Sequence, residues 1–351
     1  MGNCKQTKNK EIVDLSCVDI LDSYINRTGV ESKIWIKLEN GNYLFKIDDS
    51  FQQGFYEMIV SNVCNAIGVD CVEVKPAVFN CERMTENRAT SSFYSFMLPW
   101  NRKMAGVLVK SYLNGNSACL NLDALDKKFN KNKYERMRFA YSVKEAKLLI
   151  EQLKQSGYDV DSSIVEKLKA MCLCDYLLCQ EDRHRGNIEF LFYNYNNGKC
   201  HVKLAPMFDN GRCLGFDCNV WIEIVKLCRR NNARFVMEIE DYDFLSGKCK
   251  KVNEGKALAR EILIDENLRK TFVKLSSINF EQIVKSVAKS YPSTVSEKRQ
   301  KLAIMAFKMR VAKLERYLKV ESLKTDKKLN RLVNKLLDKK TVKNCDGKEL
   351  I

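Results

Sequence analysis

Two short runs near the start of the chain alternate between apolar and polar side chains. Residues 33–38 (KIWIKL) and 43–46 (YLFK) flank the segment Glu39-Asn40-Gly41-Asn42. An Asn-Gly pair between two alternating runs is a strong β-hairpin signal, because both residues tolerate the positive φ angles of its turn. We therefore predict two antiparallel strands here, with Lys46 at the end of the second strand.

The period of the pattern then changes from two residues to nearly four. Apolar residues recur at helical spacing within residues 51–67, and Gly68 follows them directly. A glycine just past the last apolar position is typical of a helix C-terminus. We predict a helix over 51–67, with Glu57 in its early turns. The apolar positions are Phe55, Ile59, Val63 and Ile67.

Four further elements follow from similar patterns. Two apolar runs have the length and character of strands, and two helices begin at a serine that has a glutamate three residues later, the capping-box pattern. No element is predicted for residues 80–102, which are polar, or for 114–138, which are mixed. The predicted elements are strands at 71–79 and 104–113 and helices from Ser142 to Gly157 and from Ser163 to Cys179.

Helical spacing returns at the basic end of the chain, where we predict two amphipathic helices over 302–318 and 329–337. Residues 291–351 hold 17 lysines and arginines against 7 acidic residues, so they carry +10 of the net charge of +16. One interpretation is a core-packed helix with a solvated lysine face. The other is a docking surface for nucleic acid, an acidic protein or anionic lipid. Few aromatic residues interleave the charges, which argues against base stacking.

Composition indicates a sizeable core and no membrane span. Of the 351 residues, 45% are hydrophobic, and no run approaches the roughly 20 apolar residues of a transmembrane helix. The first 14 residues contain no apolar stretch, so we expect no secretory signal and a cytoplasmic location.

The fifteen cysteines are scattered without a C-x-x-C pair, and only two histidines accompany them. We interpret the cysteines as buried free thiols rather than disulfides or zinc ligands.

One segment in the middle of the chain carries the strongest chemical pattern. Asp182 precedes Asn187 by five residues, and two short apolar strands, 188–195 and 201–205, then lead to Asp209. Phosphoryl transfer requires one carboxylate that accepts the proton of the attacking hydroxyl. It also requires an amide and a second carboxylate that hold Mg²⁺. A hairpin between the two aspartates brings them to the same phosphate, so the order and spacing predict a phosphoryl-transfer site.

The segments 182–187 (DRHRGN) and 205–211 (APMFDNG) together resemble the HipA/CtkA-like bacterial serine/threonine kinases, a divergent branch of the protein-kinase fold. The resemblance implies that Asp182 is the catalytic base and that Asn187 and Asp209 bind Mg²⁺. His184 would either take part in proton transfer or order the loop by hydrogen bonds. The D-R-H-x-x-N word is also similar to phosphoinositide-3/4-kinase motifs, so the pattern indicates kinase chemistry better than it indicates the acceptor.

A kinase also needs a lysine on the ATP phosphates and a glutamate that holds this lysine in place. Lys46, at its strand end, and Glu57, on the next helix, are the candidates for this pair. Lys110 and Tyr112 lie in the run that should form the hinge side of the nucleotide pocket, where backbone groups meet adenine.

The phosphate-covering loop is the part of the pattern that departs from the family. No G-x-G-x-x-G occurs, and residues 26–32 (NRTGVES), with Gly29 as their one glycine, are the candidate loop. Relatives of the HipA type autophosphorylate within this loop. The resemblance therefore makes Thr28 and Ser32 candidate regulatory phosphorylation sites.

These expectations define an α+β, bilobal protein-kinase-like fold, with a small antiparallel β-rich N-lobe and a larger, mainly helical C-lobe. The predicted organisation is an N-terminal extension at 1–26, the N-lobe at 27–113, the C-lobe at 114–320 and a basic helical tail at 321–351.

The implied function is ATP- and Mg²⁺-dependent transfer of the γ-phosphate to serine or threonine hydroxyls of protein, including the chain itself. A phosphoinositide or small-molecule kinase is one alternative. A pseudokinase that binds an acidic partner or an anionic surface through the basic C-terminal helices is another. Likeness to HipA raises an antitoxin partner, and likeness to CtkA raises export into a host cell. The residues decide neither.

Overall fold

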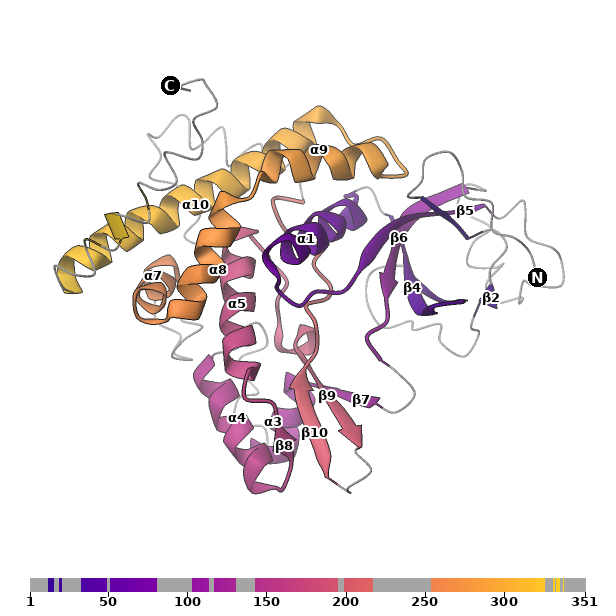
Figure 1. Ribbon diagram of the computed structural model, residues 1–351. Helices are drawn as coiled ribbons and strands as arrows, with labels where there is room; N and C mark the ends of the chain where they lie inside the picture. Colours follow the sequence, from indigo (N-terminus) through magenta and orange to yellow (C-terminus); the bar gives the residue numbers. More distant parts are fainter. Residues whose placement is uncertain are drawn as a thin grey trace.

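The computed structural model describes residues 12–15, 19–20, 33–48, 51–80, 103–113, 117–130, 143–194, 199–216 and 254–325, together with 331, 333, 334 and 337. These residues form a smaller, sheet-rich region and a larger, mainly helical region that lie side by side (Figure 1). The α+β, bilobal architecture predicted from the sequence is therefore confirmed. The candidate loop at residues 26–32 and the unassigned segment 81–102 lie outside the described residues.

The smaller region is a six-stranded sheet with the strand order β1-β5-β6-β4-β3-β2. Its strands β3 and β4 form the predicted hairpin, with Trp35 opposite Leu44. Neighbouring strands are antiparallel except for β1 and β5, which are parallel. The strands are β1 (Val13–Asp14), β2 (Asp19–Ile20), β3 (Lys33–Leu38), β4 (Gly41–Ile47), β5 (Val74–Asn80) and β6 (Lys103–Lys110).

The two faces of this sheet contribute to different cores. Tyr43 and Phe45 belong to a small core on one face. Val107 and Val109 belong to the main core, together with the helix that covers the other face. Because side chains alternate across a strand, Lys46 points to the face opposite that of Phe45, toward this helix.

The covering helix is α1 (Gln53–Ile67), which lies between the sheet and the C-terminal helices (Figure 1). Its Phe55, Ile59 and Val63 are fully buried. Gly68 ends the helix with φ 77°, in the left-handed conformation that a residue without Cβ adopts at little cost. The helix therefore ends where the sequence predicted and begins two residues later than expected.

The larger region contains a four-stranded sheet with the order β7-β9-β10-β8. Strands β9 and β10 form the hairpin predicted between the two aspartates, with Leu191 opposite Lys203. Three helices and a short 3₁₀ turn, η4, accompany this sheet. The elements are β7 (Ser117–Asn121), α3 (Leu122–Asn130), α4 (Val143–Gln155), β8 (Asp159–Val160), α5 (Ile164–Leu177), η4 (Arg185–Asn187), β9 (Glu189–Asn194) and β10 (Cys200–Leu204).

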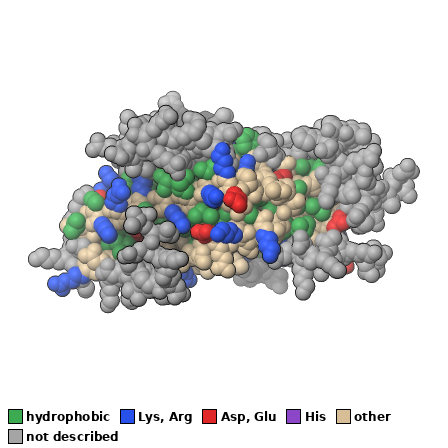
Figure 2. Space-filling model, turned by 90° about the horizontal axis from the view of Figure 1, so that it is seen from above, with side chains coloured by type: hydrophobic (Ala, Val, Ile, Leu, Met, Phe, Trp, Pro, Cys, Tyr) green, Lys and Arg blue, Asp and Glu red, His purple; other side chains and the backbone are tan. Residues whose placement is uncertain are grey.

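Within residues 254–325, four helices follow toward the C-terminal end, and α8 and α9 begin at side-chain caps. Asp265 accepts a hydrogen bond from the backbone N–H of Leu268, and Asn279 accepts one from Gln282. The face on the side of α9 and α10 carries Lys and Arg side chains dispersed among hydrophobic ones (Figure 2). The helices are α7 (Glu254–Ile264), α8 (Glu266–Ser277), α9 (Phe280–Ser290) and α10 (Glu297–Thr325).

Three expectations about these elements need correction. The strand predicted from Cys71 begins at Val74, because the backbone around Cys71 pairs instead with Met207 in an isolated parallel bridge. The strand predicted over 104–113 ends at Lys110. The segment 114–138, left without an element, contains β7 and α3, and the side chain of Asn121 accepts a hydrogen bond from the N–H of Ala124 at the start of this helix.

The capping box predicted at Ser163 is also wrong. The Ser163 hydroxyl makes no cap bond to the helix and donates to the Asp161 carboxylate at 2.9 Å. The other oxygen of Asp161 accepts from the Ser163 N–H at 2.8 Å. The Ser163 hydroxyl is thus engaged by a charged acceptor, Asp161, instead of capping α5.

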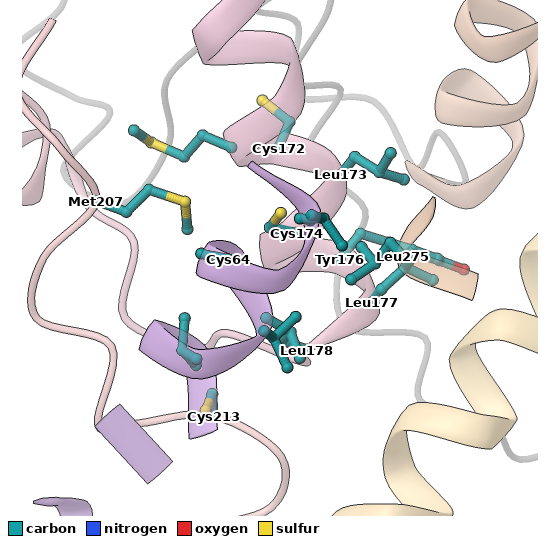
Figure 3. Packing of buried hydrophobic residues seen from close by; sticks show 14 of the residues in the cluster. Cys64, Cys172, Leu173, Cys174, Tyr176, Leu177, Leu178, Met207, Cys213 and Leu275 are labelled. Atoms are coloured by element: carbon teal, nitrogen blue, oxygen red, sulfur yellow. The ribbon is translucent and has the colours of Figure 1, made fainter. Parts of the chain in front are cut away.

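The main core is continuous across both regions. Cys64 of α1 packs beside Cys174 of α5, close to Met207 and Cys213 of the segment that contains Asp209 (Figure 3). The described cysteines are free thiols. A hydrogen bond with Cys174, together with burial, raises the pKa of Cys64, which keeps it protonated. Among the described helices, none combines the length and apolar character that a membrane span requires.

Candidate active site

Lys46 joins two carboxylates from distant parts of the sequence. Its Nζ lies 2.5 Å from Oε1 of Glu57 and 2.8 Å from Oδ1 of Asp209. Lys46 and Glu57 are only 8% and 2% exposed, whereas the Asp209 side chain is 39% exposed. Lysine and glutamate are almost never this buried unless they are paired, so the ammonium is held rather than solvated. In the described structure, β4, α1 and the segment after β10 therefore meet at the Lys46 ammonium.

The electrostatics of Asp209 follow from this contact. Burial acts to raise the pKa of its carboxyl group, but the Lys46 ammonium beside it outweighs burial and holds the pKa below its usual range. Asp209 is consequently ionised at neutral pH, while part of its side chain remains accessible. A charged, accessible carboxylate beside a buried lysine can accept a cation.

The backbone at Asp209 makes a sharp turn, and contacts before and after it hold this turn in place. Asp209 has a φ of 55°, a left-handed conformation that turns the chain sharply. Two hydrogen bonds hold Met207 ahead of it, from the Met207 N–H to the Asp70 carbonyl and from the Val72 N–H to the Met207 carbonyl, both 2.9 Å. After it, a Cβ at Gly211 would lie 2.9 Å from the Gln53 side chain, so this position packs tightly on the start of α1.

The loop from Asp182 to Asn187 is closed by its own hydrogen bonds. The Asn187 side-chain amide and the His184 N–H both donate to the Asp182 carbonyl, at 2.9 and 3.0 Å. Nδ1 of His184 accepts from the Gly186 N–H at 3.0 Å. A Cβ at Gly186 would lie 2.8 Å from the His184 ring, so a larger residue would push this ring away. The loop thus presents Asp182 and Asn187 from a rigid turn.

Gln180 links this loop directly to Asp209. Its Nε2 donates to the Asp209 carbonyl at 3.1 Å, while its Oε1 accepts from the backbone N–H of Asp182 at 3.4 Å. Nothing in the sequence distinguishes Gln180, because a glutamine between a helix and a polar loop forms no recognisable pattern.

Arg183 is a second link, and it is buried. It donates through Nε to Asp175 at 3.1 Å and through Nη1 to the carbonyls of Phe208 and Asn187, at 2.7 and 3.2 Å. It also contacts the Asn210 side chain. Burial raises the pKa of Asp175, although Arg183 acts in the opposite direction. The sequence does indicate a buried ion pair at Asp175, because a lone charge inside the run MCLCDYLLC requires a buried partner.

Two other arginines bracket the loop. Arg185 donates through Nε to Asp123 at 2.8 Å and lies 3.2 Å from Asp126, so two ion pairs attach the loop to α3. Arg212 is half-exposed, and its guanidinium lies 3.5 Å from the carboxylate of Asp182. Asp182 therefore has a cation close to its accessible side.

The remaining candidates have mixed placements. Tyr112 donates to Glu189 at 2.5 Å, and its ring centroid lies 5.7 Å from that of Phe208, directly before Asp209. The Nζ of Lys110 lies 3.8 Å from a carboxylate oxygen of Glu73. Thr28, Gly29 and Ser32 lie outside the described residues. Of the residues singled out from the sequence, the structure brings Lys46, Glu57 and Asp209 into direct contact. It places Asp182, His184 and Asn187 in one hydrogen-bonded loop and Tyr112 beside Phe208.

The side chains that could hold a metal are an amide and a carboxylate. No three His, Cys, Asp or Glu side chains of the described residues converge as a metal cluster. Mg²⁺ is usually bound by one or two protein carboxylates together with substrate phosphates and water, and not by an all-protein cage. The donor set of Asn187 and Asp209 fits Mg²⁺ on a phosphate ligand.

Comparisons with known proteins bear on the fold of the chain. The structure resembles the crystal structure of the Helicobacter pylori proinflammatory kinase CtkA, with a TM-score of 0.60 and 16% identity over 90% of this chain and 99% of that chain. It also matches HipA from a Shewanella oneidensis toxin–antitoxin complex, with a TM-score of 0.46 and 12% identity over 86% of this chain and 66% of HipA. No protein-family model and no curated protein matches the sequence. The chain therefore has the CtkA-like, bilobal kinase fold that its motif predicted.

Proposed function

We propose that this protein is an ATP- and Mg²⁺-dependent kinase that phosphorylates serine or threonine hydroxyls of protein, including its own. The proposal depends on one observation above the others. Lys46 holds Glu57 and Asp209 at 2.5 and 2.8 Å, and Gln180 ties Asp209 to the loop that presents Asp182 and Asn187. Phosphoryl transfer requires little covalent chemistry from the protein and depends on such positioning.

Each residue has a role in this proposal. The acceptor hydroxyl oxygen forms a bond to the γ-phosphorus while the bond to the β–γ bridging oxygen breaks, and Asp182 accepts the hydroxyl proton. Lys46 neutralises phosphate charge, and Glu57 keeps Lys46 in place. Asn187 and Asp209 bind Mg²⁺, which when bound neutralises charge on the phosphates. His184 orders the loop through its bond to Gly186, and the region around Lys110 and Tyr112 faces adenine.

The decisive experiment incubates the purified protein with Mg²⁺ and ATP and measures its intact mass. We expect wild type to gain about 80 Da per phosphate and Asp182→Asn and Asp209→Asn to gain nothing. Asp159→Asn is the matched control, because Asp159 is a largely exposed carboxylate that contacts His201. It lies in β8 of the four-stranded sheet, whereas Lys46 lies in β4 of the six-stranded sheet. Equal mass gain in all four proteins would refute the proposed roles. Peptide mapping of the phosphorylated wild type then tests Thr28 and Ser32.

A phosphoinositide or small-molecule kinase is the second candidate, favoured by the cationic face on the side of α9 and α10 (Figure 2). Mixed vesicles that contain phosphoinositide provide its test. Phosphorylation of the lipid without any protein phosphorylation would reverse the order of the two candidates. A pseudokinase remains if neither acceptor is labelled and Mg²⁺-ATP gives no shift of the melting temperature.

A further inference from the structure

The segment between α9 and α10 contacts the start of α1, about 240 residues earlier in the chain. The side chain of Gln52 donates to the Ser293 hydroxyl at 3.0 Å and to the Thr294 carbonyl at 3.1 Å. The ring of Tyr291 meets that of Phe55 edge-on, with centroids 5.8 Å apart. The C-terminal helices therefore contact the N-terminal end of the helix that carries Glu57.

The backbone at this junction is strained. Gln52 precedes α1 with φ 55° and ψ 48°, a left-handed conformation that is unfavourable for a residue with a Cβ. Such conformations persist where the surrounding structure holds them. The bonds from Gln52 to Ser293 and Thr294 are among the contacts that hold it, so the start of α1 is tied to the segment between α9 and α10.

Arg299, in the first turn of α10, connects this junction to the segment that follows Asp209. Its guanidinium donates to the carbonyl of Phe51, just before α1, and to the carbonyl of Phe216 at 3.4 Å. The rings of Phe51 and Phe216 are themselves in edge-on contact, with centroids 5.9 Å apart. Both bonds come from the same nitrogen, Nη1, which has two hydrogens and so can donate to two carbonyls on separate segments. Arg299 therefore lies where α1 and the post-Asp209 segment meet.

The same segment reaches the proposed catalytic base. The guanidinium of Arg212 lies 5.1 Å above the ring of Phe216 and 3.5 Å from the carboxylate of Asp182. A chain of contacts thus leads from α10 through Arg299 and Phe216 to Arg212 and Asp182. A second branch leads through Phe51 to α1 and Glu57.

We infer that Arg299 is a positioning residue for phosphoryl transfer. It attaches the start of α1 to the segment after Asp209. Glu57 on α1 then holds Lys46 where Lys46 also contacts Asp209. This inference rests on the proposed kinase function for its chemical consequence, but the mechanical part concerns the protein alone. The hydrogen bonds described for Arg299 go to the backbone carbonyls of Phe51 and Phe216, so we expect its loss to change the rate of the chemical step more than the affinity for nucleotide.

The first test compares Arg299→Ala with Lys298→Ala, which removes an exposed cation one position earlier on the same helical turn. We expect kcat for phosphorylation to fall about 10- to 100-fold in Arg299→Ala, with KM for ATP changed less than about threefold. Lys298→Ala should match wild type. Arg299→Lys should recover part of kcat, because an ammonium can still reach one of the two carbonyls. A purely structural loss would lower the active fraction and would not be rescued in this graded way.

The second test does not depend on catalysis. Amide hydrogen exchange of the nucleotide-free protein should accelerate in residues 53–60 of α1 in Arg299→Ala and remain unchanged in Lys298→Ala. If wild type transfers no phosphate, the kinase proposal fails while the exchange result still decides the positioning role. Unaltered exchange, or kcat equal in the two alanine variants, would overturn the inference. Should Arg299→Ala fail to fold, Arg299→Lys and Gln52→Ala provide the same measurements with milder changes.

Discussion

Arg183 shows, at the residue scale, how much of the site depends on one buried cation. Its guanidinium joins Asp175 of α5 to the carbonyls of Asn187 and Phe208. Removing one partner of a buried ion pair leaves the other charge without compensation. We expect Asp175→Ala to lower the free energy of unfolding by about 3–5 kcal/mol in denaturant titrations. Asp175→Asn should cost less, because its amide oxygen still accepts from Arg183. Equal costs would show that the charge of Asp175 contributes little.

Asp209 predicts a dependence of stability on pH, because its pKa in the folded protein lies below the ordinary value. A depressed carboxyl pKa contributes stability that is fully present above the unfolded pKa, near about 3.9, and is lost as pH falls through the folded pKa. The difference in unfolding free energy between wild type and Asp209→Asn should therefore be constant near neutrality and shrink below about pH 4. Lys298→Ala, which alters no carboxyl group, should show no such convergence. A difference independent of pH would contradict the Lys46–Asp209 contact.

At the scale of elements, the packing of β6 against β4 determines where Lys46 lies. A Cβ at Gly106 would lie 2.1 Å from the carbonyl oxygen of Lys46, so Gly106→Ala must displace one strand. We expect a loss of about 1–3 kcal/mol in stability and a fall of about 100-fold in the phosphorylation rate. Gly68→Ala is the contrasting variant, because a Cβ there meets nothing within 4 Å and the cost arises from its φ of 77°. It should lose about 1–2 kcal/mol and keep its rate. Wild-type activity in Gly106→Ala would show that the strands adjust freely.

The elements that the sequence predicted correctly have local signals. The hairpin of β3 and β4 follows from Asn40-Gly41, and the end of α1 follows from Gly68. Likewise, the spacing from Asp182 to Asn187 is short enough for one loop to fix both side chains. The pairing of Lys46 with Glu57 was predictable for the same reason, because the two residues lie on consecutive elements.

The features that the sequence left open depend on contacts between distant segments. Cys71 resembles a strand residue, yet its backbone pairs with Met207, which no local pattern indicates. The contacts of Arg183 require α5, the loop at residues 182–187 and residue 210 to be in place together. Asn121, at the start of α3, was a usable cap signal, but the mixed composition around it obscured the helix.

At the scale of the whole molecule, the candidate site depends on both regions. Lys46 and Glu57 come from the smaller region, whereas Asp209 and the Asp182 loop come from the larger one. The contact between Lys46 and Asp209 therefore joins the regions directly. A ligand that binds both regions in the folded state and neither in the unfolded chain raises stability by mass action.

This arrangement predicts a melting shift that requires nucleotide and metal together. At a free ATP concentration of 100 times Kd, with excess Mg²⁺, wild type should gain about 2.7 kcal/mol, seen as a higher Tm. Asp209→Asn should lose most of this shift, because the variant lacks the carboxylate proposed to bind the metal on the phosphates. Asp159→Asn should keep the shift, since its side chain contacts His201 in the other sheet of the protein. EDTA should reduce the wild-type shift to the level of Asp209→Asn. A shift that persists undiminished in EDTA would place nucleotide binding elsewhere than at Lys46, Asn187 and Asp209.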